Sequence, residues 1–318
     1  MKITAFVSHE DCSRHDTGWS HPDHQGRLPA IVRAVQRDMV ALWEPVLQLE
    51  AVPATDEDLC LIHTPEHVAR VREVAADAAR SEETLELDGV PVSGASWDAA
   101  RASAGAALTA VDAVLAGEAR NAFALSRPPG AGAWADGPGG FGLFNNVAIA
   151  ARHLRERHAA ARVLVVSWGV RPPLALARLL ADDEGIGLIS IHQHPLSFPA
   201  PDPSAAEHPE VAGAALSPGS GGEEFEEALR AALAAVPPAE SPDFVLLAAG
   251  FDILDADPVG QLAVEPHEVH AITLALREWA DERAGGRLVS VLEGGYAAAE
   301  TARAVVQHLH ALAGLPPA

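Results

Sequence analysis

The sequence contains little cysteine and few cationic residues. Its two cysteines, Cys12 and Cys60, are too few for a disulfide-stabilised scaffold. It shows neither an apolar signal-peptide core nor an apolar span of about 20 residues. Lys and Arg total 22 against 44 Asp and Glu, which gives a formal net charge of −22. Because phosphate contacts need clustered cations, this balance argues against nucleic-acid and anionic-membrane partners. We expect a cytoplasmic protein whose acidic surface could attract a cationic small molecule.

The composition indicates one large folded unit. Hydrophobic residues make up 48% of the 318 residues, enough to bury a sizeable core. No low-complexity run divides the chain, so we expect a single domain over residues 1–318. The weakest point is residues 197–222, a stretch rich in Pro, Gly, Ser and Ala that reads as a long functional or mobile loop.

Strand and helix patterns alternate along the chain. Short apolar runs predict strands at residues 3–7, 122–126, 163–166, 187–191, 244–248 and 288–292. Helical spacing predicts helices near residues 28–40, 96–117, 173–180, 223–235, 265–284 and 297–313, and further helices that begin at Pro65, after a capping Thr64, and at Val147. This alternation predicts an α/β fold in which helices cover both faces of a parallel sheet.

The most informative stretch is the strand at residues 163–166 and the seven residues after it. Ligands and catalytic groups of doubly wound sheets lie at the carboxyl ends of the strands, which makes residues 167–173 the place to search for chemistry. The sequence there is Ser-Trp-Gly-Val-Arg-Pro-Pro. None of these side chains is a general base or a good metal ligand at neutral pH. The scaffold is therefore enzyme-like, but its expected catalytic position holds no catalytic group.

Seven passages, in order, resemble conserved passages of the histone deacetylase superfamily, in its bacterial acetoin-utilisation and acetylpolyamine-amidohydrolase branch. They are His21–Leu28, His63–His67, Arg127–Gly130, Gly140–Ala150, Ser190–Pro195, Ala249–Asp252 with Asp257–Gly260, and Leu292–Tyr296. The resemblance runs from about residue 15 to about residue 300. It implies the arginase/deacetylase-like fold, a single domain around a mostly parallel sheet of about eight strands with helices on both faces.

The resemblance also implies where the catalytic groups of that family would lie. Its members hold zinc with Asp, His and Asp, which lowers the pKa of a bound water and polarises the amide carbonyl. Here the first two ligand positions fall on Gly169 and Arg171, and the third ligand is retained as Asp252. A guanidinium neither coordinates a cation nor gives up its proton. We therefore expect no bound zinc, and no other cofactor.

The proton-transfer groups implied by the resemblance are also altered. The tandem His pair falls on Ala131 and Gly132, and the Asp that orients one of those histidines falls on Ser167. The tyrosine that donates a hydrogen bond to the developing oxyanion is retained as Tyr296. Two arrangements of the altered site stay open: Arg171 pairs with Asp252, or Arg171 turns to solvent and backbone groups bind Asp252.

Three functions are compatible with these observations. The first is a pseudoenzyme that keeps the fold and a pocket for an acylated amine, such as an acetyl-lysine or acetylpolyamine; the resemblance predicts a lining that includes Phe141, His192, Gly294, Gly295 and Tyr296. The second is an active amidohydrolase with a relocated metal site, for which His192, His194 and Asp252 are candidates. The third is a structural or interaction subunit with a protein partner or a second copy of itself.

Overall fold

The computed structural model describes residues 4–194 and 212–318. The strands are β1 (Thr4–Ser8), β2 (Val46–Glu50), β3 (Leu85–Leu87), β4 (Val90–Val92), β5 (Asn121–Ala124), β6 (Val163–Gly169), β7 (Ile186–Gln193), β8 (Ala212–Leu216), β9 (Phe244–Ala249) and β10 (Leu288–Leu292). The α-helices are α1 (Arg27–Arg37), α2 (Met39–Leu42), α3 (Asp56–Leu59), α4 (Pro65–Ser81), α5 (Ser96–Leu115), α6 (Asn146–Arg157), α7 (Leu174–Leu180), α8 (Gly222–Ala234), α9 (Val269–Arg283) and α10 (Ala298–Ala313).

Eight of the strands form one parallel sheet in the order β2-β1-β5-β10-β9-β6-β7-β8. The central strands are apolar along their whole length because both faces of the sheet are covered. Alternate residues of β6 enter different cores: Val163 and Val165 pack with one cluster, whereas Leu164, Val166 and Trp168 pack with the other. This confirms the predicted parallel sheet with helices on both faces.

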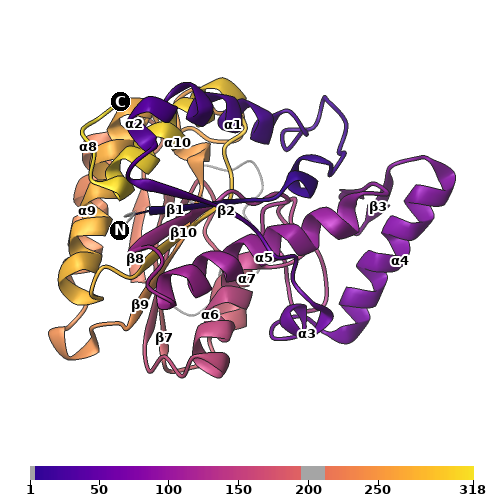
Figure 1. The fold of residues 1–318 in the computed structure, drawn as a ribbon, viewed down its shortest axis with the longest axis horizontal. Helices are drawn as coiled ribbons and strands as arrows, with labels where there is room; N and C mark the ends of the chain where they lie inside the picture. Colours follow the sequence, from indigo (N-terminus) through magenta and orange to yellow (C-terminus); the bar gives the residue numbers. More distant parts are fainter. Residues whose placement is uncertain (1–3, 195–211) are drawn as a thin grey trace.

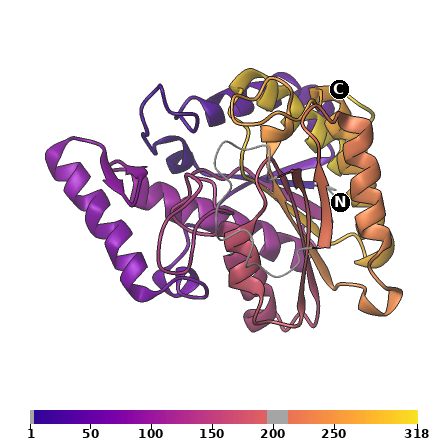
Figure 2. The same cartoon turned by 180° about the vertical axis from the view of Figure 1, so that it is seen from behind.

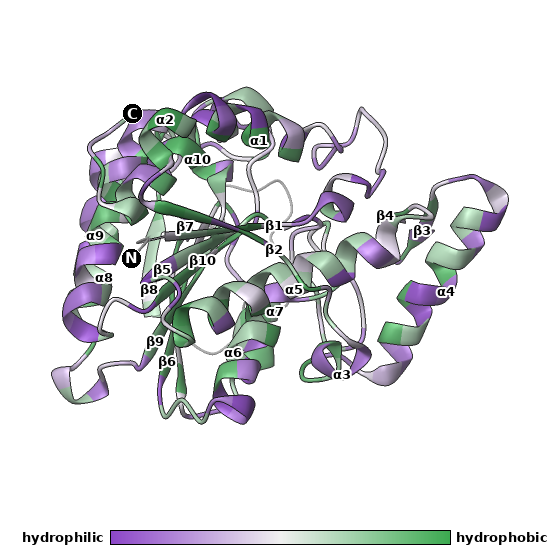
Figure 3. Cartoon of the chain, viewed as in Figure 1, coloured by the Kyte–Doolittle hydropathy of each residue, from purple (hydrophilic) through white to green (hydrophobic). Residues whose placement is uncertain are grey.

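Two helical layers enclose the sheet (Figure 1). Helices α1, α8, α9 and α10 pack on one face, and α5, α6 and α7 pack on the other. Figure 3 shows the strands as mainly hydrophobic between helices that carry hydrophilic residues on their outer sides. The carboxyl ends of β6, β9 and β10 therefore meet at one edge of a sheet that is closed on both faces.

Helix α4 and the small β3–β4 sheet lie outside the eight-stranded sheet and its helical layers (Figure 1). Helix α4 and the antiparallel pair β3–β4 lie at the end of the molecule opposite α9 in both cartoon views (Figures 1 and 2). Helix α4 begins as predicted: the hydroxyl of Thr64 accepts a hydrogen bond from the backbone of His67 at 3.2 Å, and Pro65 is the first helical residue.

The structure corrects several predicted boundaries. Strands β2 and β8 and the pair β3–β4 were not predicted. Strands β3 and β4 have three residues each, β8 is rich in Gly and Ala, and the apolar-polar alternation of β2 extends over only a few residues. The predicted helix over residues 28–40 is divided at Asp38 into α1 and α2. Most of the predicted loop over residues 197–222 lies outside the described residues, and its last part contains β8 and the start of α8.

Candidate functional site

A cavity of about 260 Å³ opens at the carboxyl ends of the central strands. Its wall comes from the loop after β5, the end of β6 with the start of α7, the end of β9, and the turn after β10. The lining residues are Pro129, Ala131, Gly132, Trp134, Gly140, Ser167–Ala175 except Val170, Ala248, Gly250, Asp252, Glu293, Gly294 and Tyr296. This is where ligands bind in open α/β sheets.

Asp252 lies at the base of this cavity and faces Gly169. A methyl group added at Gly169 would be 3.3 Å from Asp252 Oδ1, so the side-chain direction of residue 169 points at this carboxylate. The backbone N–H of Val170 donates to the same oxygen at 3.2 Å. Arg171 follows as an exposed residue that also lines the cavity. The backbone contact predicted for Asp252 is present, and an ion pair between Arg171 and Asp252 stays a prediction.

The cavity contains two carboxyl groups with perturbed acidity. Burial, with a smaller contribution from the negative charge of the neighbouring Asp257, raises the pKa of Asp252 to about 7. Burial likewise raises the pKa of Glu293 to about 7, against the hydrogen bonds from the backbone of Ala131 and Gly130, which lower it. Near neutral pH these two acids are therefore partly protonated, whereas an ordinary surface carboxyl is fully ionised.

Glu293 fixes the loop that carries the predicted proton-transfer positions. Its Oε2 accepts the backbone N–H of Gly130 at 2.6 Å and that of Ala131 at 2.9 Å. Gly132 lies next in this loop, and a methyl group added there would lie 2.7 Å from the carbonyl oxygen of Gly139 and 2.8 Å from the Cα of Gly140. Both positions line the cavity, but the backbone packing at residue 132 leaves no room for a side chain.

Tyr296 also lines the cavity, and both its backbone and its ring have partners. Its N–H donates to Asp257 Oδ2 at 2.6 Å. The guanidinium carbon of Arg27 lies 4.7 Å from the ring centroid, and the Phe141 ring meets it edge-on at 5.5 Å. Burial raises the pKa of the Tyr296 phenol well above its usual value. The hydroxyl therefore stays protonated at neutral pH and is a hydrogen-bond donor.

Arg27 organises this turn, and sequence reasoning did not identify it. The side chain is fully buried at the start of α1. It donates from Nε to the carbonyl of Gly295 at 2.6 Å and from Nη2 to that of Glu293 at 2.9 Å. It also pairs with the fully buried Asp23, which Arg127 contacts at 3.1 Å. The only available signal was its place in the His21–Leu28 passage, because nothing local distinguishes a buried arginine from an exposed one.

Three residues predicted for the pocket are not part of the cavity wall. Phe141 packs behind Tyr296 instead of lining the space. His192 directs Nδ1 to the hydroxyl of Ser190 at 2.9 Å. Gly295 is pressed against Phe251 and Thr301, where an added methyl would lie 2.7 Å and 2.9 Å from their side chains. Gly294 and Tyr296 do line the cavity.

The candidate relocated metal site is not assembled within residues 4–194 and 212–318. There, His192, His194 and Asp252 do not form a group of three whose ligand atoms lie within 4.8 Å of one another. The backbone N–H of His194 donates to the carbonyl oxygen of Leu216, the last residue of β8.

The donor set of the cavity does not fit zinc. Of the three ligand positions implied by the family resemblance, only Asp252 carries a ligating side chain, because Gly169 has none and Arg171 is a permanent cation. Gly294 packs directly against Asp252, since an added methyl at Gly294 would lie 2.5 Å from Asp252 Oδ2.

The helix-covered parallel sheet of eight strands with a cavity at its carboxyl edge is an arginase/deacetylase-like α/β fold, as its match to the solved HDA15 HD domain shows. The family model described as the histone deacetylase domain matches residues 21–312. The chain therefore belongs to the histone deacetylase family, as the resemblance of its seven passages indicated.

Individual relatives agree with this assignment. The chain is 33% identical over 330 residues to "Polyamine deacetylase HDAC10" from Homo sapiens, covering 98% of this chain and 48% of that relative. It is 34% identical over 284 residues to "Histone deacetylase-like amidohydrolase" from Pseudomonas aeruginosa, covering 87% of this chain and 72% of that relative. The solved HDA15 HD domain superposes with a TM-score of 0.85 at 27% identity, covering 100% of this chain and 90% of that one. The chain thus spans about half the length of the human relative.

No helix within the described ranges combines the length and the apolar character needed to cross a bilayer.

Proposed function

We propose that this chain is a pseudoenzyme of the deacetylase family that binds an acylated amine in the cavity without hydrolysing it by zinc chemistry. The observation that carries the proposal is the set of side chains around Asp252. The position facing its carboxylate is Gly169, and the next ligand position, Arg171, is a cation.

The size of the lost driving force supports the absence of hydrolysis. Zinc lowers the pKa of a bound water from about 15.7 to about 7, so its loss removes roughly 9 pK units, or on the order of 12 kcal/mol, from hydroxide formation. The absence of a proton-transferring His pair at Ala131 and Gly132 costs a further ~10²–10⁴-fold. A single hydrogen-bond donor cannot compensate for both.

The remaining groups suit binding of an acyl group. The protonated Tyr296 hydroxyl can donate to an acyl oxygen, and Arg27 holds this tyrosine against the cavity. Asp252 and Glu293 offer carboxyl groups in the same cavity. The net charge of −22 favours an amine with further positive charges. Two relatives bear the words polyamine deacetylase and amidohydrolase in their names, which supports an acetylpolyamine or acetyl-lysine as ligand class.

We also infer that residues 1–318 form one domain, since strands from Thr4 to Leu292 share one sheet. A cytoplasmic location agrees with the unpaired Cys12 and Cys60. Neither inference affects the binding proposal.

The test uses an N-acetylated polyamine and an acetyl-lysine peptide. Calorimetry should detect binding of at least one of them, and Tyr296→Phe should weaken it by about 10-fold through loss of one hydrogen bond to a polar ligand. Acetate release should stay at background when zinc is added. Zinc-dependent turnover that disappears in Asp252→Asn would contradict the proposal, and so would the absence of binding to either probe.

A further inference from the structure

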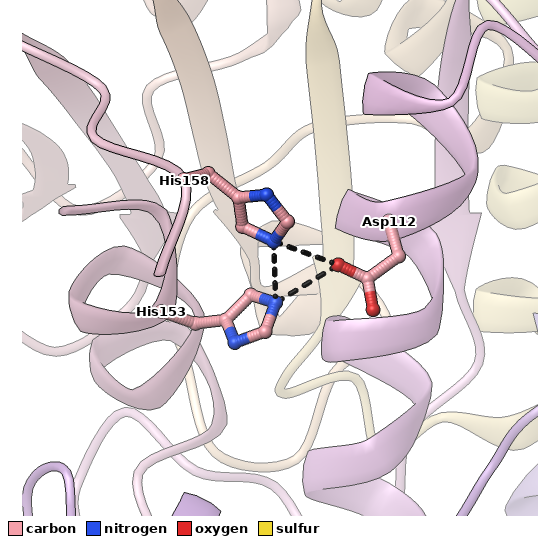
Figure 4. A group of neighbouring side chains, drawn as sticks. All are labelled: Asp112, His153 and His158. Atoms are coloured by element: carbon pink, nitrogen blue, oxygen red, sulfur yellow. Dashed lines mark hydrogen bonds and ion pairs between the residues drawn. The ribbon is translucent and has the colours of Figure 1, made fainter. Parts of the chain in front are cut away.

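Asp112, His153 and His158 bring three ligand atoms together far from the cavity (Figure 4). Asp112 is near the end of α5, His153 is in the last turns of α6, and His158 follows α6 directly. Both helix ends precede strands, α5 before β5 and α6 before β6. The cluster therefore lies toward the amino ends of the parallel strands, whereas the cavity lies at their carboxyl ends.

The three atoms form a nearly equilateral triangle. His153 Nε2 is 2.8 Å from Asp112 Oδ1, His158 Nε2 is 3.1 Å from the same oxygen, and the two Nε2 atoms are 3.0 Å apart. In Figure 4 both imidazole rings direct these nitrogens at one carboxylate oxygen. Sequence reasoning did not single out these residues, because only the fold brings α5 beside α6.

Protons alone do not satisfy this triangle. A carboxylate oxygen only accepts, so each of the two contacts with Asp112 needs a proton on the imidazole nitrogen involved. If both nitrogens carry that proton, both N–H bonds point at one oxygen and their hydrogens crowd each other, because the nitrogens are only 3.0 Å apart. If only one carries it, the other nitrogen presents a lone pair to the carboxylate at about the same separation. One edge of the triangle is repulsive in either case, and a cation bound to all three lone pairs removes the conflict.

The geometry and donor types select the cation. A tetrahedral zinc ion with ligands at about 2.0–2.1 Å separates them by about 3.3 Å, so edges of about 3 Å need to open by only a few tenths of an ångström. Two imidazole nitrogens and one carboxylate oxygen are the ligands that zinc and its first-row neighbours accept, whereas Mg²⁺ and Ca²⁺ prefer oxygen alone.

The burial of the group suits an ion with one open position. The His153 side chain is 8% exposed, that of His158 is 33% exposed and that of Asp112 is 54% exposed. The ion would thus be anchored on the buried ring and reached from solvent on the other side, where water supplies the fourth ligand. We propose that Asp112, His153 and His158 form a zinc-class divalent cation site that ties the end of α5 to the end of α6.

Zinc binding by the untagged protein tests this site. After a chelator has stripped the protein, it is reloaded with excess Zn²⁺ and dialysed against zinc-free buffer; elemental analysis should then find about one zinc per chain, and competition with a chromophoric chelator should give its affinity. Co²⁺ should give the visible absorption of a four-coordinate ion. His158→Ala should weaken binding by about 100-fold or more, since even outer partners of a ligand contribute 10–100-fold. His267→Ala removes an exposed histidine elsewhere and should leave binding unchanged.

Further variants separate this site from the cavity. Asp252→Asn should retain the zinc, and Asp112→Asn should lose it. Zinc should also raise the melting temperature of the wild type and not that of His158→Ala. Failure to bind zinc stoichiometrically would overturn the proposal, as would binding that persists in both Asp112→Asn and His158→Ala. These outcomes are independent of whether the cavity binds an acylated amine.

Discussion

Gly169 and Asp252 face each other across the ends of β6 and β9, and a methyl group on Gly169 would approach Asp252 Oδ1 to 3.3 Å. Residue 169 is therefore oriented toward the one retained carboxylate but supplies no ligand to it. The fold tolerates glycine at this position, because the β6–β9 pairing is made by backbone groups and does not depend on the side chain at residue 169.

Restoring the two missing ligand positions should create a zinc site in the cavity. Gly169→Asp with Arg171→His supplies a carboxylate and an imidazole beside Asp252. In a His158→Ala background, which removes the second site, the double variant should gain about one zinc per chain, and adding Asp252→Asn should abolish it. Acetate release should remain low, because Ala131 and Gly132 transfer no proton. Efficient hydrolysis of acetyl-lysine by the double variant would show that the missing His pair is unimportant.

Gly132→Ala should destabilise the protein. Its added methyl would lie 2.7 Å from Gly139 O and 2.8 Å from Gly140 Cα, and neither backbone atom can turn away as a side chain can. We expect a loss of about 1–3 kcal/mol in the free energy of unfolding, measured with urea. Gly137→Ala, in the same loop but with 3.9 Å to its nearest neighbour, is the matched control and should change little. Equal stability of both variants would refute the packing argument against a histidine at residue 132.

Glu293→Gln should flatten the pH dependence of stability. The pKa of Glu293 is raised from 4.5 to about 7 in the folded state, mainly by burial. Between these values the folded state holds a proton that the unfolded state has released, so stability falls as pH rises from about 4.5 to about 7. Glutamine can still accept the N–H groups of Gly130 and Ala131 but does not titrate. Urea midpoints at pH 5, 6 and 7 should decline less in Glu293→Gln than in the wild type or in the exposed control Glu118→Gln; identical slopes would contradict this.

Arg27→Ala should be strongly destabilising. It removes two hydrogen bonds to the turn that carries Tyr296 and one partner of the fully buried Asp23. Breaking one partner of a buried ion pair typically costs about 3–5 kcal/mol, although Arg127 still contacts Asp23 and reduces the loss. Chemical unfolding measures the change, and Arg33→Ala, exposed on the same helix, serves as control. A cost below about 1 kcal/mol would mean that Arg127 alone neutralises Asp23.

The sequence by itself determined the fold class and the residues that occupy the ligand positions implied by the family resemblance. Apolar runs such as residues 163–166 signalled buried strands because both faces of a parallel sheet are covered, and the identities of Gly169 and Arg171 follow directly from the chain. It did not determine β2 or β8. These short strands form at the two edges of the sheet by pairing with β1 and β7, and that pairing is not visible in their local sequence.

Only the tertiary structure decided which side chains share a space. Arg27 donates hydrogen bonds to Glu293 and Gly295, which are 266 and 268 residues away in the chain. Asp112 contacts His153, which is 41 residues away. Local spacing carries no information about such contacts, since they depend on the strand order and on how α5 packs beside α6. The same folding buries Asp252 and Glu293 together, and that burial is what raises their pKa values.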